Sequence, residues 1–187
     1  EAEAIRDNIL LAAGTLDSQM GGQGFSGFKV EAENVRHYHP KEAYGTTDWR
    51  RMLYMMKVRQ EREPTFGVFD CPDFNQTVPN RSRSTTPLQA LSLLNSPFVI
   101  QQADALASRM LAKQGADNDR ITRAYRVTLG RGPSHDERDR ALSYITSTAR
   151  TLGQPENRTN KKTTPRQQAW GLFCQVLLAG AEFRYLD

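Results

Sequence analysis

The sequence predicts a mainly α-helical fold, an irregular helical bundle with a long loop-rich N-terminal half and at most one short strand or hairpin. Apolar residues recur at helical spacings in several segments, three helix-capping boxes lie in the C-terminal half, and Gly and Pro repeatedly interrupt residues 21–85. With 187 residues, 38% of them hydrophobic, the chain can build one ordinary core. We therefore expect a single domain over 1–187, irregular over 21–85 and helical over 86–187.

The N-terminal half contains one clear amphipathic segment. Apolar side chains over residues 4–16 share one helical face, and the glycine-rich run 20–24 is expected to end this helix. Residues 21–47 are predicted to be irregular loop. The run 52–56 is too uniformly apolar to distinguish a short helix from a buried strand. Residues 63–79 carry closely spaced prolines, which predict a long loop.

Helix boundaries are clearest in the C-terminal half. Each capping box pairs a hydroxyl residue at the N-cap with Glu or Gln three residues later, and the three boxes begin at Thr86, Ser134 and Thr164. The first helix is interrupted at Asn95-Ser96-Pro97, where a second one starts. A further helix, capped by Asn118 or Asp119, is expected to end at Gly130. Residues 154–163 are the expected mobile loop.

Charge and cysteine content exclude several function classes. The 25 basic and 21 acidic residues nearly balance, so a nucleic-acid partner is disfavoured. No apolar run is long enough to span a bilayer. Residues 1–6 lack signal-peptide character, and we interpret the chain as a fragment of a larger protein. Cys71 and Cys174 form no C-x-x-C motif, so we expect two free thiols and no cofactor in this chain.

The main candidate site lies just before the helix that starts after Thr86. Two carboxylates on a Pro-containing loop followed by two guanidiniums could form an anion site, an acid/base pair or an oxygen-ligand metal site. The same residue types could equally satisfy a buried loop through hydrogen bonds and ion pairs, and we favour this structural interpretation. The candidate catalytic residues are Asp70 and Asp73, and the candidate binding residues are Asn75, Arg81, Arg83 and Thr85.

Two weaker patterns also occur in the N-terminal half. His37 and His39 would share one face of an extended segment and could bind a metal if Asp48 or Asp73 supplied a third ligand, although a solvated pair is favoured. Residues 22–27 match the letters of a dinucleotide-binding fingerprint. They follow a predicted helix rather than a strand, so we interpret them as a helix-terminating loop.

Several segments together resemble a known family. In chain order they are Ala4-Ile5-Arg6-Asp7, Leu16 through Met20-Gly21-Gly22, Phe69-Asp70-Cys71-Pro72-Asp73, Arg83-Ser84-Thr85-Thr86-Pro87-Leu88-Gln89-Ala90-Leu91 through Leu94-Asn95, Leu129-Gly130-Arg131-Gly132-Pro133 and Glu182-Phe183-Arg184-Tyr185-Leu186-Asp187. They are similar to the family called domain of unknown function 1553, a C-terminal module of large planctomycete-type bacterial proteins. The resemblance implies export to the periplasm or cell surface, and frequent association with a cytochrome C-type haem module. It implies no established reaction.

Two functions follow as hypotheses. The first is a non-catalytic helical module that packs against other domains of its own polypeptide and supports binding of a partner, with a haem-bearing module or a polysaccharide as candidates. The alternative is a hydrolase acting on carbohydrate or another polymer, with Asp70 and Asp73 as acid/base groups or metal ligands.

Overall fold

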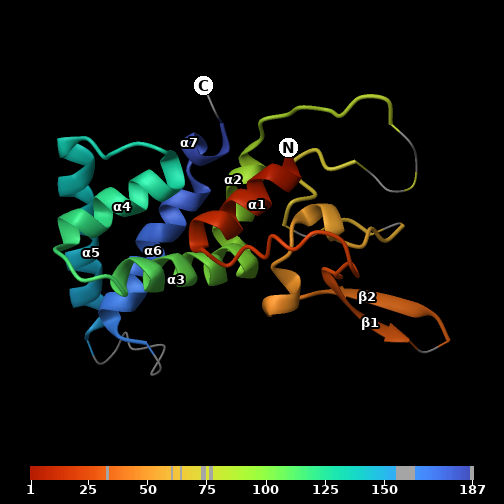
Figure 1. The fold of residues 1–187 in the computed structure, drawn as a ribbon, viewed down its shortest axis with the longest axis horizontal. Coiled ribbons are helices and arrows are strands. Elements are labelled where there is room, and N and C mark those ends of the chain that lie inside the picture. The colour runs from red at the N-terminus through yellow and green to blue at the C-terminus, as the bar shows by residue number, and fades with distance from the viewer. Residues whose placement is uncertain are drawn as a thin grey trace.

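The computed structural model describes residues 1–32, 34–59, 61–63, 65–72, 75, 78–154 and 163–185. Within these residues the chain forms seven α-helices and one two-stranded antiparallel hairpin, so the predicted mainly α class with a short hairpin is confirmed (Figure 1). The elements are α1 (Ala2–Ala13), β1 (Phe28–Ala32), β2 (Arg36–Pro40), the 3-10 turns η1 (Thr46–Asp48) and η2 (Met52–Tyr54), α2 (Pro87–Asn95), α3 (Pro97–Leu111), α4 (Asp117–Leu129), α5 (His135–Leu152), α6 (Pro165–Ala179) and α7 (Ala181–Arg184).

Helix α6 is the centre of the helical half. It packs against α3 and α5 and also contacts α2 and α4. Trp170, Cys174 and Leu178 of α6 are completely buried, because the helix is apolar on most of its circumference and is covered on several sides. One contiguous apolar core extends from α1 through α6. None of the helices in the described ranges is long and apolar enough to cross a membrane.

The predicted helix starts in the C-terminal half are confirmed at the capping boxes. The hydroxyls of Ser134 and Thr164 accept the backbone N–H three residues ahead, at 3.3 and 3.2 Å. Gly130 ends α4 in the left-handed conformation, with φ 71°. The predicted N-caps of α4, Asn118 and Asp119, were wrong by two and three residues, because its N-cap is Ala116. The expected mobile loop lies mostly outside the described residues.

Helix α1 is shorter than predicted. It ends at Ala13, and Gly14 adopts φ 79° while its N–H donates to the carbonyls of Leu10 and Leu11. The glycine run at 20–24, which was expected to end this helix, lies in the following loop. A single glycine in the left-handed region is sufficient to terminate the helix, so the apolar Leu16 beyond it is not helical.

The hairpin corrects the prediction of irregular loop over residues 21–47. Val30 pairs with Tyr38, and the Phe28 ring makes an edge contact with the Tyr38 ring at 6.2 Å between centroids. Only Phe28 is buried among the strand residues, and the hairpin projects away from the helices (Figure 1). The ambiguous run at 52–56 forms the 3-10 turn η2, which buries Met52 and exposes Leu53.

A buried arginine joins the N-terminal half to the helices. Arg6 on α1 is 2% exposed and donates to the carbonyl oxygens of Asp48 and, at 2.8 Å, of Arg50. Its guanidinium also lies over the rings of Phe25 and Phe98, 4.8 and 5.0 Å from the centroids. Arg6 therefore satisfies two carbonyls at the end of η1 and just after it, beside the short bridge between Asp17 and Arg50.

Candidate functional site

Four of the predicted site residues line one open cleft of about 800 Å³, which we call the arginine cleft. Residues 79–85 line the cleft together with Arg184 at the end of α7 and Tyr185. Figure 1 shows the chain passing the start of α1 before it enters α2. The cleft-lining residues that carry the argument are Asp70, Arg81, Arg83, Thr85, Arg184 and Tyr185.

Asp70 lies at the base of this cleft as part of a hydrogen-bonded clamp. Its backbone has φ 55°, a left-handed conformation that Asp tolerates better than most residues. Its carboxylate accepts the Ser84 N–H at 2.6 Å, and the Ser84 hydroxyl lies 3.0 Å from both carboxylate oxygens. Buried Gln89 on α2 completes the clamp by donating to the carbonyls of Val68 and Ser84, each at 3.1 Å.

The arginines of the cleft do not pair with Asp70 as the structural interpretation expected. Arg81 instead donates to Glu3 on α1 at 2.8 Å. Burial acts to raise the pKa of Glu3, but hydrogen bonding and charge attraction from Arg81 prevail and lower it. Arg83 has no hydrogen bond or ion pair with any residue that the structure describes.

The C-terminal wall of the cleft supplies a third guanidinium that sequence reasoning missed. The Nη1 atom of Arg184 is buried without a hydrogen-bond partner among the described residues. Its guanidinium lies 5.4 Å from the centroid of the Tyr185 ring, and the Tyr185 hydroxyl is 3.0 Å from Thr85 Oγ1. Arg184 and Tyr185 belong to the terminal motif of the sequence. Nothing in that motif indicates that Tyr185 contacts Thr85, which lies 100 positions earlier.

Two predicted residues, Asn75 and Asp73, remain to be placed. Asn75 is exposed and is not among the described residues that line it. Asp73 lies outside the described residues. Of the predicted catalytic pair, only Asp70 therefore lies in the described part of the chain. Its carboxylate is hydrogen-bonded to Ser84.

The histidines on β2 have no third metal ligand beside them among the described residues. His37 and His39 share a strand face and are exposed, and His39 Nε2 lies 3.5 Å from Glu31. Asp48, one proposed third ligand, is buried and accepts from Lys41 and from the Gly45 N–H at 2.5 and 2.9 Å. Within the described ranges, no three His, Cys, Asp or Glu side chains are grouped to hold a metal ion. The glycine motif at 22–27 precedes a strand, so the strand-turn-helix context of a nucleotide site is missing.

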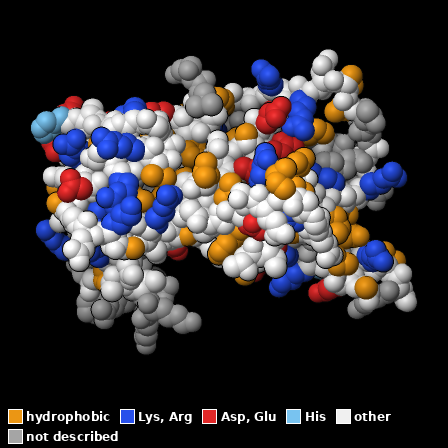
Figure 2. All heavy atoms as spheres, in the orientation of Figure 1, with side chains coloured by type: hydrophobic (Ala, Val, Ile, Leu, Met, Phe, Trp, Pro, Cys, Tyr) orange, Lys and Arg blue, Asp and Glu red, His pale blue; other side chains and the backbone are white. Residues whose placement is uncertain are grey.

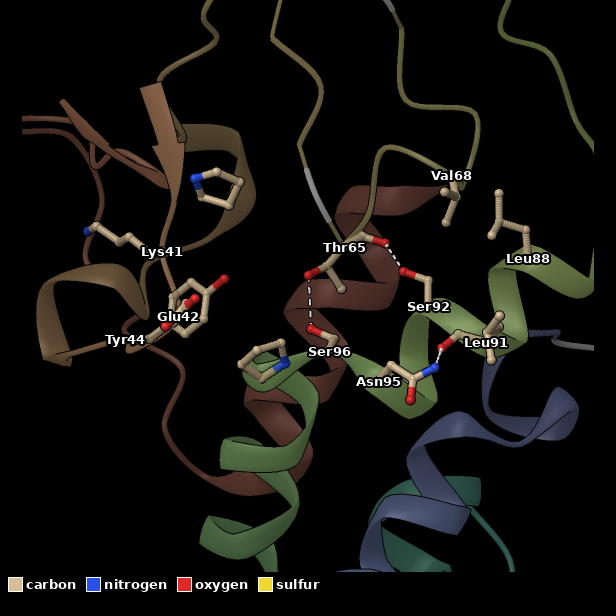
Figure 3. Close-up of a pocket in the computed structure, with 12 residues that line it drawn as sticks. Lys41, Glu42, Tyr44, Thr65, Val68, Leu88, Leu91, Ser92, Asn95 and Ser96 are labelled. Carbon is tan, nitrogen blue, oxygen red and sulfur yellow. Dashed lines mark hydrogen bonds between the residues drawn. The ribbon is translucent and has the colours of Figure 1, made fainter. Parts of the chain in front are cut away.

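A second hollow, which we call the α2 groove, was not predicted. It encloses about 370 Å³ between the 40–44 segment, the 65–68 turn and α2. Figure 3 shows Lys41, Glu42 and Tyr44 on one side and Val68, Leu88 and Leu91 on the other. Leu88 and Leu91 are 57% and 55% exposed. The leucines at 88, 91 and 94 lie on the face of α2 opposite buried Leu93. Apolar residues on two faces of a short helix are the sequence feature that could have predicted this groove.

The polar groups between these two walls are already satisfied by one another. Thr65 Oγ1 lies 2.9 Å from Ser96 Oγ, and the Ser92 hydroxyl donates to the Thr65 carbonyl at 2.8 Å (Figure 3). Burial, followed by the charge of nearby Glu63, raises the pKa of Tyr44 to about 12, so its hydroxyl remains protonated. The groove therefore offers apolar contact area rather than reactive groups.

The two cysteines are free, as expected, and neither has the environment of a nucleophile. Burial raises the pKa of the Cys71 thiol despite nearby Lys57. Cys174 is buried in the core, and burial raises its pKa strongly. Thiolates are disfavoured at both positions.

Comparison with known proteins identifies a family. A family model described as "Protein of unknown function (DUF1553)" matches residues 1–145, which include the clamp, the α2 groove and most of the arginine cleft. Residues 146–187 lie outside the matched region. Comparisons with curated proteins and with solved structures gave no match. Because the match covers most of the chain, the protein belongs to the DUF1553 family, as its sequence motifs indicated.

Proposed function

We propose that this chain is a non-catalytic interaction module of a larger exported bacterial protein, and that the α2 groove docks an apolar segment from another domain of that polypeptide. The observation that carries the proposal is the exposure of Leu88 and Leu91 beside a hollow whose hydroxyl groups, on Thr65, Ser92 and Ser96, are hydrogen-bonded within the fold. Exposed apolar patches next to a groove are typical of protein interaction sites.

The energetics favour docking over solvent exposure. Complete burial of a leucine side chain is worth about 1.5 to 3 kcal/mol, so covering the exposed half of both leucines would contribute about 2 kcal/mol. Pro97 and Val68 add apolar surface to the same hollow. The groove has no unsatisfied hydroxyl among Thr65, Ser92 and Ser96 that would select a polar substrate.

The state of Asp70 supports the non-catalytic assignment over the hydrolase alternative. A general acid or base needs a carboxyl oxygen free to reach a substrate. Both oxygens of Asp70 are within hydrogen-bond distance of Ser84, and one of them accepts the Ser84 backbone N–H. A hydrolytic activity lost in Asp70→Asn while the fold is retained would contradict this assignment.

The double variant Leu88→Gln, Leu91→Gln tests the docking site. Gln preserves helix propensity, and both side chains are already exposed, so the isolated chain should keep its free energy of unfolding within about 0.5 kcal/mol. In the native polypeptide, docking stabilises the module, so the same variant should lower its stability by about 2 kcal/mol. Unfolding followed by urea titration in both contexts provides the measurement.

Leu53→Gln is the matched control, because Leu53 is 69% exposed and is not among the groove residues. It should have no effect in either context. The docking proposal would be refuted if the groove variant and the control lost the same free energy of unfolding in the native polypeptide. It would also be refuted if the groove variant lost as much stability in the isolated chain as in the native polypeptide.

A further inference from the structure

The arginine cleft contains positive charge that the fold does not use. Its lining holds three arginines and two carboxylates, Glu1 and Asp70. The carboxylate of Asp70 is bound by Ser84. Arg83 has no ion pair or hydrogen bond within the part of the chain that the structure describes, and Arg184 has a buried Nη1 without a partner there. Arg83 is exposed, so its donors meet a ligand directly, whereas the buried Nη1 of Arg184 gains an acceptor only if a ligand enters the lining beside it.

Guanidinium groups favour one ligand chemistry. The planar fork of Arg matches carboxylate and sulfate oxygens in bidentate geometry, and such charge-assisted bonds are among the stronger polar contacts. The cleft, at about 800 Å³, is far larger than a single inorganic anion requires and lies within the range of pockets for extended ligands. A chain that carries repeated anionic groups fits both properties.

Neutral polar side chains lie among the arginines of the cleft and narrow the class of anionic ligand further. Asn80, Ser82 and Thr85 line the same cleft and can exchange hydrogen bonds with sugar hydroxyls. The Arg184 guanidinium lies over one face of the Tyr185 ring, 5.4 Å from its centroid, and so competes with a nucleobase for that face. Basic and acidic side chains are interspersed over the molecular face in Figure 2, so attraction to a polyanion would come from the arginines of the cleft rather than from an extended basic surface.

We infer that the arginine cleft binds an acidic glycan, a chain of sugar units that carries carboxylate or sulfate groups, with Arg83 and Arg184 as the anion-binding residues. This site lies on the other side of the α2 helix start from the groove and is independent of the docking proposal, because Leu88 and Leu91 do not line it. The groove variants should therefore leave glycan binding unchanged.

Isothermal titration of the purified chain tests the inference, with a heparin oligosaccharide, an oligogalacturonate, a neutral cello-oligosaccharide, an oligoglutamate and single-stranded DNA as probes. We expect one or both acidic glycans to bind and the neutral glycan not to bind. Arg83→Gln and Arg184→Gln should each weaken binding at least about tenfold, because each removes a charge-assisted contact. Arg83→Gln should not perturb folding, since Arg83 contacts no described side chain through a hydrogen bond or ion pair.

Arg36→Gln provides the matched control, because it removes the same charge from exposed strand β2, away from the cleft. It should change the affinity by less than about twofold once salt screens long-range attraction. The inference fails if neither acidic glycan binds or if Arg36→Gln weakens binding as much as Arg83→Gln. It also fails if the oligoglutamate or the DNA binds as tightly as the acidic glycans, because the cleft would then select charge alone.

Discussion

Gln89 shows how a single side chain can hold a long loop on a helical core. Its amide nitrogen donates to the carbonyls of Val68 and Ser84, which belong to two ends of the 65–85 segment, and its amide oxygen lies 3.4 Å from the Thr86 N–H. Gln89 itself is 2% exposed, whereas Val68 is half-buried and Ser84 is exposed, so losing the amide removes two part-buried hydrogen bonds. The clamp therefore depends on one residue of the capping box as much as on Asp70.

Gln89→Leu should destabilise the chain by about 1 to 3 kcal/mol, because two part-buried hydrogen bonds are lost while the side-chain volume is nearly kept. Urea unfolding of the variant measures this. Gln114→Leu is the control, since Gln114 is exposed, and it should be neutral within about 0.5 kcal/mol. Equal midpoints for the two variants would show that the clamp does not stabilise the loop.

Residue types at the candidate site were predictable from the sequence, but their partners were not. The acidic and basic side chains of the 70–85 segment were expected to pair with one another. In the structure, Asp70 instead accepts a hydrogen bond from Ser84, and Arg81 donates one to Glu3. The partners of these side chains depend on how α1 and α2 are placed relative to the 70–85 segment. The spacing of residues within the segment does not determine that placement.

At the scale of elements, local signals were reliable where one short motif determines a boundary. The capping boxes placed the starts of α2, α5 and α6 because the N-cap and the third residue interact within one turn. The position of the hairpin was not predicted, because its strands are mostly exposed and lack a clear alternation of apolar and polar residues. The end of α1 was placed too late because several glycines competed as stop signals, and Gly14 is the one that adopts the left-handed conformation.

An ion-pair network joins the turn between α4 and α5 to α7. Arg131 donates to Glu137 at 2.8 Å through two nitrogens and to Glu182 at 2.5 and 2.7 Å. Hydrogen bonding from Arg131, then from the Ser134 backbone, lowers the pKa of Glu137 to about 2. Because α7 carries the Arg184 that lines the arginine cleft, this network positions one wall of the cleft.

Glu137→Gln should reduce stability modestly at neutral pH, since the network is largely exposed and solvent screens it. A lowered carboxyl pKa stabilises the fold above the unfolded value and loses that contribution on acidification. The difference from wild type should therefore be present above about pH 4.5 and vanish as the pH falls to about 2. Glu42→Gln, at an exposed position, is the control for urea unfolding across this pH range. A pH-independent difference would contradict the ion-pair origin.

At the scale of the whole molecule, the two hollows lie on either side of the 65–86 segment and have opposite chemistry. The α2 groove is bounded by exposed leucines, and the arginine cleft is bounded by guanidiniums. Both depend on the clamp, because Val68 lines the groove while Asp70 and Gln89 line the cleft. Sequence reasoning found the segment but not the hollows, since each is closed by residues from distant parts of the chain.

The most direct test of the docking function is the solvent accessibility of the α2 groove in the native polypeptide. Leu91→Cys, in a Cys71→Ser background that leaves only buried Cys174, would be labelled with a maleimide in the isolated chain and in the native protein, with Leu53→Cys as the control. We predict rapid labelling of both cysteines in the isolated chain and at least about tenfold slower labelling at position 91 alone in the native protein. Equal labelling rates at position 91 in the two contexts would contradict the proposal that this groove is covered by a partner domain.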